Sequence, residues 1–178
     1  MKRTLIILVL LVCSIRLGIA LPGSTTIYIV RHAEKDLSDP KNQDPELSAE
    51  GKLRAADLAE KLKAEKIDAV FSTKYKRTSQ TGDPVAQNNG INIQEYEAQN
   101  FKVISDLIKT KFNKRKILIV GHSNTVLELV EAFGAIRPLP ALTDDDYDFF
   151  FIVKIDNLGK AVLNVEQYGK QHHSSIIK

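Results

Sequence analysis

Residues 26–34, TIYIVRHAE, constrain the fold more than any other stretch of the sequence. Four of them, residues 27–30, are apolar or aromatic and rich in β-branched side chains, which is typical of a strand buried on both faces. The run stops at Arg31 and His32, so a cation and an imidazole stand at the end of the predicted strand. Taken alone, such a pair can mark a functional site or only the point at which the strand reaches solvent. The rest of the chain decides between these two interpretations.

A second copy of this pattern occurs later in the chain. Residues 117–120, ILIV, form another apolar run, and His122 follows it after one glycine. Residues 67–71 predict a further short buried strand, and Arg77 lies in the hydroxyl-rich segment behind it. A strand followed by such a segment resembles an anion-binding junction between a strand and a helix.

Helical patterns separate these strands. Ser48 is the predicted N-cap of a helix whose apolar side chains recur at helical spacing through residues 55–62, and residues 101–112 keep the same spacing. The helix that carries Arg77 contains Pro84, which is expected to end or kink it.

The second half of the chain adds one helix and three strands. A helix capped by Ser123 or Asn124 is predicted after the second apolar run. Residues 91–93 predict a short strand at a sheet edge, and residues 149–155 and 161–165 predict a hairpin. Strands that alternate with helices indicate an α/β fold, here a three-layer α/β/α sandwich with a mainly parallel central sheet.

The N-terminal segment, residues 1–20, has the layout of an export signal. Basic residues precede the apolar run of residues 5–12, and small residues up to Ala20 offer a cleavage point. The apolar stretch is about half as long as the roughly 20 residues that a membrane span needs. We therefore expect an exported, periplasmic or extracellular domain of residues 21–178, with a lipid anchor on Cys13 as the alternative to cleavage.

Removal of that signal changes the charge of the chain. The 25 basic and 22 acidic residues give a net charge of +3, but three of the basic residues lie in the signal and none of the acidic ones does. The mature domain would thus be neutral, which gives no support for nucleic-acid binding. Cys13 is the only cysteine, so the mature domain would have neither a disulfide nor a cysteine-bound metal.

The candidate functional residues stand where such a sheet binds its ligands, beyond the carboxyl ends of the strands. Arg31, His32, Arg77 and His122 would then face one pocket. Guanidinium groups bind phosphate oxygens bidentately, and imidazoles donate hydrogen bonds or attack phosphorus, so the set suits a tetrahedral oxyanion. Neither a metal nor another cofactor is expected, because the cations would oppose a metal's charge and the four residues come with no HExxH or other acidic motif of metal-ligand type.

The other two histidines, His172 and His173, are adjacent near the C-terminus. They lie in residues 171–178, which we expect to form a loose tail. We therefore do not expect them in the pocket.

Taken in order, the motifs resemble those of the histidine phosphatase superfamily, which has the phosphoglycerate-mutase-like fold. Each piece is weak alone, but the ordered set is specific and covers nearly the whole mature chain. The matching pieces are Val30-Arg31-His32-Ala33-Glu34, Leu47-Ser48-Ala49-Glu50-Gly51, Ser72 with Lys76-Arg77-Thr78-Ser79-Gln80-Thr81, and Val120-Gly121-His122-Ser123-Asn124-Thr125.

The resemblance implies a role for each residue of the pocket. His32 would be the nucleophile that becomes a phosphohistidine, and Arg31, Arg77 and His122 would hold the phosphoryl oxygens. Covalent transfer of this kind divides the hydrolysis into two easier steps, and it requires no metal.

The proton donor is less defined. The family commonly has a Glu or Asp in the segment after the third strand, and Glu97 is the preferred candidate here, with Glu95 or neither residue as the alternatives. Without such an acid, the enzyme would favour good leaving groups, which need less protonation.

The function that follows from these expectations is hydrolysis of a phosphate monoester, either a small molecule or an envelope glycan. The chain lacks room for the long insertions of the glycolytic mutases, so the resemblance implies a small, open, single-domain phosphatase. Two alternatives stay open: a protein phosphohistidine phosphatase, and a non-catalytic phosphate-binding envelope protein.

Overall fold

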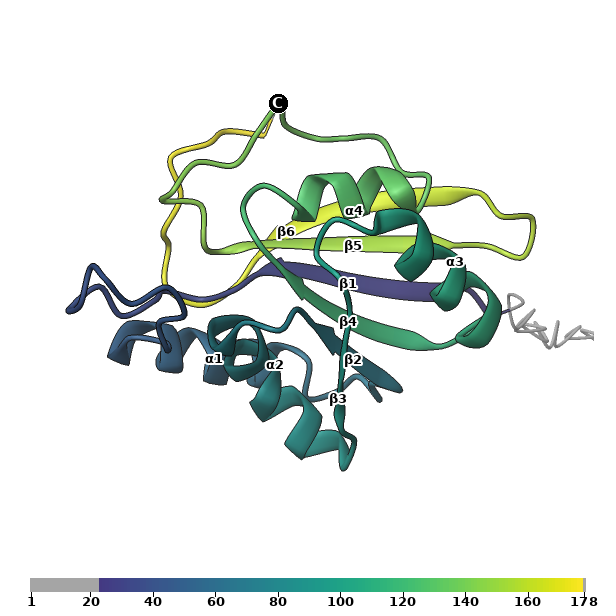
Figure 1. Ribbon diagram of the computed structural model, residues 1–178. Helices are drawn as coiled ribbons and strands as arrows, with labels where there is room; N and C mark the ends of the chain where they lie inside the picture. Colours follow the sequence, from purple (N-terminus) through teal and green to yellow (C-terminus); the bar gives the residue numbers. More distant parts are fainter. Residues whose placement is uncertain (1–22, 178) are drawn as a thin grey trace, which may run out of the picture.

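The first strand, β1 (Thr25–Arg31), lies inside a six-stranded sheet in the computed structural model, which describes residues 23–177 (Figure 1). The other strands are β2 (Ala69–Ser72), β3 (Ile93–Glu95), β4 (Lys116–Gly121), β5 (Phe149–Ile155) and β6 (Ala161–Gln167). Their order is β3-β2-β4-β1-β5-β6, with the first four parallel and the β5–β6 hairpin antiparallel beside β1. The predicted mainly parallel α/β sheet is confirmed, including the hairpin and the edge position of β3.

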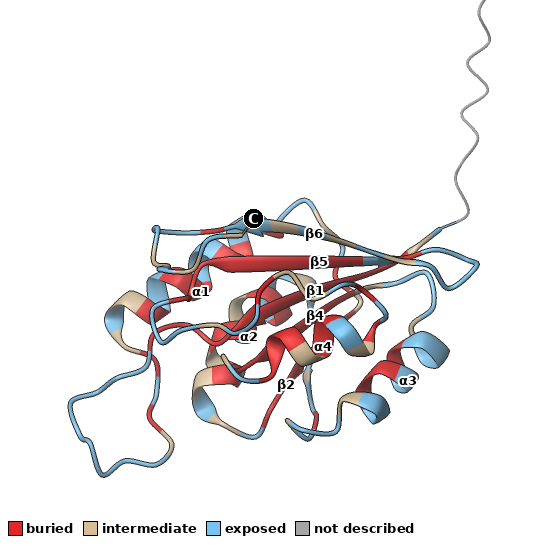
Figure 2. Cartoon of the chain, turned by 90° about the horizontal axis from the view of Figure 1, so that it is seen from above, coloured by how far each residue is buried: buried red, intermediate tan, exposed pale blue. Residues whose placement is uncertain are grey.

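Helices cover both faces of this sheet. Side chains of α1 (Ala49–Lys61) and α2 (Lys76–Asn89) pack with Tyr28 and Val30 of β1. Side chains of α3 (Phe101–Lys111) and α4 (Val126–Ala132) pack with Ile27 and Ile29 from the opposite face. Successive side chains of a strand point to opposite faces, so the unbroken apolar run of β1 serves two cores at once. Figure 2 shows the consequence, since β1 and most of β5 are buried along their length.

The start of α1 is fixed against the loop that follows β1. The side chain of Ser48 accepts a hydrogen bond from the Gly51 amide at 3.1 Å, which confirms the predicted N-cap. The Ser48 amide donates to the Glu34 carbonyl at 2.9 Å. A Cβ atom on Gly51 would lie 2.1 Å from that carbonyl oxygen, so only glycine permits this approach.

Pro84 does not end α2, which is one of the two effects expected of it, since the helix continues to Asn89 with Val85 and Ala86 buried in the core. The predicted N-cap of α4 was wrong. The N-cap of α4 is Thr125 instead of Ser123 or Asn124, since residues 123–125 form a turn in which the Thr125 amide donates to the His122 carbonyl.

The expectation of a loose C-terminal tail was also wrong for residues 171–177. His172 is hydrogen bonded to Glu34 and His173 to Asp148, and both carboxylates are almost completely buried. Buried carboxylates need donors, and the tail supplies them.

The predicted export signal and Cys13 lie outside the described residues. Within residues 23–177, the helices are too short and too polar for any of them to span a membrane.

The contact at Gly51 leads to a stability prediction. Gly51→Ala is expected to lower the free energy of unfolding by about 1–3 kcal/mol, because the new methyl group forces α1 away from the Glu34 carbonyl. Urea denaturation measures the change. Lys52→Ala, at the next and exposed position of the same helix, is the control and should stay within about 0.5 kcal/mol. Equal stability of the two variants would contradict the proposed close approach.

Candidate active site

The parallel pairing of β1 with β4 brings two histidines together. Arg31 pairs with Gly121 at the last position of the register, and the next residue of each strand is a histidine. The His32 amide donates to the Gly121 carbonyl at 2.9 Å. The rings of His32 and His122 consequently meet edge to face, with their centroids 5.3 Å apart.

Arg77 reaches the same place from the first turn of α2. Arg31, His32, Arg77 and His122 all line one open pocket of about 330 Å³. The structure thus brings together the four residues that the sequence predicts to bind or attack phosphate.

His32 is held as a neutral imidazole. Its Nδ1 atom lies 2.8 Å from the carbonyl oxygen of Ala33, and a carbonyl can only accept, so Nδ1 carries the proton and Nε2 has a free lone pair. Burial is the main cause that lowers the pKa of His32 to about 3, and the nearby charges of Arg31, His122 and Arg77 lower it further. The side chain is therefore neutral at neutral pH, with its proton on Nδ1 and a lone pair on Nε2.

His122 is oriented by two hydroxyl groups that the sequence did not single out. Its Nε2 atom lies 2.9 Å from Thr73 Oγ1, which lies 2.9 Å from Thr78 Oγ1. The hydroxyl of Thr78 lies near the carbonyls of Tyr75, at 2.7 Å, and Thr73, at 3.0 Å, and it must donate its proton to one of them. Thr73 therefore donates its own hydroxyl proton to Thr78, and its oxygen accepts from the N–H of His122. Burial, followed by the charges of Arg77 and Arg31, lowers the pKa of His122 to about 4.

Each arginine of the pocket stacks on a tyrosine. The guanidinium carbon of Arg31 lies 3.9 Å from the ring centroid of Tyr147, and that of Arg77 lies 4.4 Å from the ring centroid of Tyr75. The Nε atoms of both arginines are buried and have no hydrogen-bond partner within residues 23–177. The two stacks hold both guanidinium groups at the pocket.

The candidate proton donor lies beside this pocket. Glu97 is exposed and lines a neighbouring cavity of about 460 Å³, which shares Tyr75, Ala98 and Gln99 with the pocket of the two histidines. Glu95, the exposed last residue of β3, lines neither of these two pockets. The geometry thus favours Glu97 over Glu95, although its role as a donor stays a prediction.

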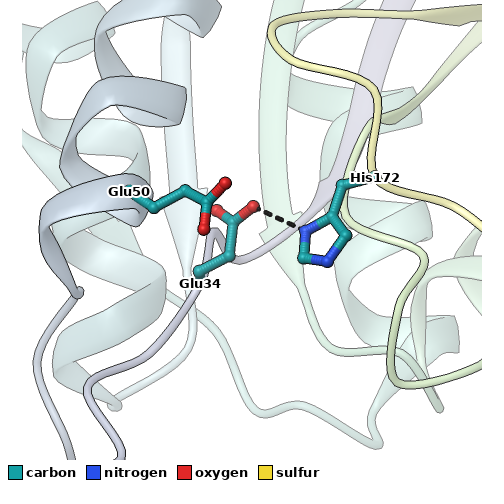
Figure 3. Close-up of side chains that lie close together, drawn as sticks. All are labelled: Glu34, Glu50 and His172. Atoms are coloured by element: carbon teal, nitrogen blue, oxygen red, sulfur yellow. Dashed lines mark hydrogen bonds and ion pairs between the residues drawn. The ribbon is translucent and has the colours of Figure 1, made fainter.

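Glu34, to which the sequence assigned no role, belongs to a cluster with Glu50 and His172 (Figure 3). The carboxylate of Glu34 accepts from Arg54 Nε at 2.8 and 3.0 Å and lies 3.0 Å from His172 Nδ1. Glu50 is paired with Lys170 at 3.0 Å. With a cation already paired to each carboxylate, the cluster is built as an ion-pair network and suits a metal poorly.

The histidine phosphatase superfamily (branch 1) model matches residues 27–100. The solved structure of the protein histidine phosphatase SixA complexed with tungstate has a TM-score of 0.66 and 18% identity, covering 80% of this chain and 96% of that one. The mycobacterial glucosyl-3-phosphoglycerate phosphatase has a TM-score of 0.60 and 12% identity, covering 82% and 98%. YhfR of Bacillus stearothermophilus has a TM-score of 0.59 and 18% identity, covering 80% and 96%. None of the curated proteins matches the chain.

The lowered pKa values of the histidines lead to a prediction for stability. Below pH 6.5 the two histidines bind protons in the unfolded chain, but in the folded chain His32 and His122 stay neutral. The free energy of unfolding should therefore decrease as the pH is lowered. From pH 7 to pH 5, His32 alone accounts for about 2 kcal/mol of this loss.

Urea denaturation at the two pH values tests this dependence, with His32→Gln as the variant that cannot titrate. The variant should lose less stability than the wild type over the same interval. The same loss in both proteins would show that His32 is not held neutral.

Proposed function

We propose that this chain, which shares the histidine phosphatase fold and matches that superfamily over residues 27–100, hydrolyses phosphate monoesters through a phosphohistidine on His32. The observation that carries the proposal is that two arginines, Arg31 and Arg77, line one pocket with His32, whose Nε2 atom has a free lone pair. Guanidinium groups suit phosphate oxygens, and the lone pair suits attack on phosphorus.

In the first step, Nε2 of His32 forms a bond to phosphorus as the bond from phosphorus to the ester oxygen breaks. Arg31 and Arg77 stabilise the charge on the equatorial oxygens during the transfer. His122 joins them only as an imidazolium, since the N–H of its neutral form is already donated to Thr73, and the negative charge of a bound phosphate favours that protonated form. The departing alkoxide takes up a proton. In the second step, water attacks the phosphohistidine, which releases inorganic phosphate and restores the neutral imidazole.

The cavity beside Tyr75 supports a leaving group of moderate size. It is lined by polar side chains that include Lys74, Glu97 and Asn100, which suit a hydroxylated alcohol, and Glu97 would donate the proton to the departing oxygen. If residues 1–20 are an export signal, the substrate is an extracytoplasmic ester, either a small molecule or an envelope glycan.

A phosphohistidine in a protein is the second candidate substrate. The likeness to the protein histidine phosphatase SixA, together with the open pocket around His32, favours this candidate. A phosphohistidine is a good leaving group and needs little protonation, so Glu97 would then contribute little.

The proposed nucleophile can be tested directly. Residues 21–178 should hydrolyse p-nitrophenyl phosphate, and His32→Ala should lower kcat by at least about 10³-fold, on the scale of other removed nucleophiles. EDTA should leave the wild-type rate unchanged, because the mechanism uses no metal. A wild-type chain that binds phosphate without turnover would instead support the non-catalytic alternative, and circular dichroism checks that the variant folds.

The proposed proton donor has a separate signature. Glu97→Gln should lower kcat for an alkyl phosphate by about 10²-fold, because an alkoxide leaves poorly without a proton, but should change the rate with p-nitrophenyl phosphate far less. Glu95→Gln is the matched control and should leave both rates unchanged. If both substrates respond equally to Glu97→Gln, the side chain is not the acid.

A further inference from the structure

The loop that precedes β5 holds the guanidinium group of Arg31. Nη1 of Arg31 donates to three main-chain carbonyls, those of Thr143 at 2.9 Å, Asp144 at 3.0 Å and Asp146 at 3.3 Å. The nearest carboxylate, that of Asp144, is fully exposed and 3.9 Å away. The direction of Arg31 is therefore set by the path of the loop backbone.

The same loop is tied to the C-terminal tail through the carboxylate of Asp146, which has no exposed surface. One oxygen accepts from the amides of Ser174 and Ser175, both at 3.0 Å. The other accepts from the hydroxyl of Ser175 at 2.6 Å and from the amide and hydroxyl of Thr143 at 2.6 and 2.9 Å. Asp146 thus accepts a hydrogen bond from Arg31 with its main-chain carbonyl and hydrogen bonds from the tail with its carboxylate.

His172 adds a second connection between the tail and this loop. Its ring stacks on Tyr147 at 5.1 Å between centroids, and Tyr147 is the residue on which Arg31 stacks. The Tyr147 amide donates to the His172 carbonyl at 2.9 Å, and the His172 amide donates to Asp148 at 3.0 Å. Figure 1 shows the tail (yellow) running beside the loop (green) above the ends of β1 and β5.

We propose that the C-terminal tail, residues 171–175, is a positioning element of the phosphate pocket, and that Asp146 is the positioning residue through which it sets the geometry of Arg31. This role rests on the proposed function of the pocket in binding phosphate. Every polar contact of Arg31 Nη1 in the described structure is with a loop that the tail holds. Release of the tail frees that loop, and Arg31 then binds an oxyanion with fewer of its donors aligned.

The test compares the affinity of the full chain for inorganic phosphate by titration calorimetry. One carboxylate oxygen of Asp146 accepts three hydrogen bonds and the other accepts two, and Asp146→Asn replaces one of these oxygens with an NH₂ group, which can only donate. Because the loop then loses its connection to the tail, the dissociation constant for phosphate should rise about tenfold or more. Asp68→Asn is the matched control, since its carboxylate accepts from the Lys116 amide at the opposite end of the sheet. That variant should change the affinity less than twofold.

A double-mutant cycle separates positioning from a general loss of stability. If Asp146 acts through Arg31, Asp146→Asn should have no further effect on phosphate affinity in a chain that already carries Arg31→Ala. Equal losses in both backgrounds would overturn the proposal.

A shortened chain that ends at Gln171 provides a second route if Asp146→Asn fails to fold. It should show the same loss of affinity and a higher KM for p-nitrophenyl phosphate, and wild-type affinity in this chain would overturn the proposal. A wild-type chain that binds phosphate but hydrolyses no ester would refute the proposed function alone, because the affinities still decide the role of the tail.

Discussion

The parallel pairing of β1 with β4 is the interaction on which the rest of the site depends. Because the last residues of the two strands, Arg31 and Gly121, are paired in the register, the residues that follow them meet at one edge of the sheet. Parallel strands need helices on both faces, and α2 therefore returns beside the same edge with Arg77 in its first turn. A cationic pocket is thus a product of strand register, and no long insertion is needed to build it.

Such a pocket has an electrostatic cost, which its surroundings reduce. Two guanidinium groups and two imidazoles lie within one small volume, so burial and mutual repulsion keep the imidazoles neutral. The arginines stay charged, and each is stabilised by the face of a tyrosine and by oxygen atoms of a loop or a carboxylate. A bound oxyanion would neutralise the excess positive charge that these contacts leave.

The sequence predicted the parts of this arrangement that depend on periodicity and strand ends. The apolar runs before His32 and His122 indicated both the sheet and the edge at which the histidines meet. The sequence did not predict the hydrogen bonds that hold Arg31 and its loop in place, because these contacts leave no local sequence pattern. Arg31 is held by main-chain carbonyls, which any residue supplies, and Asp146 and His172 act on partners far from them in sequence. That α2 continues past Pro84 has a related reason, since burial of Val85 in the core stabilises the turns beyond the proline.

The location of the tail also has a consequence for the β5–β6 hairpin. Asp146 stands just before β5, and its partners Ser174 and Ser175 stand just after β6, so the two strands lie between the carboxylate and its serine donors in sequence. The antiparallel pairing of β5 with β6 returns the chain to the end of the sheet from which it left, and so brings the tail back to the loop. A change that unpairs the hairpin would therefore also reach the loop that contacts Arg31, although neither strand lines the pocket.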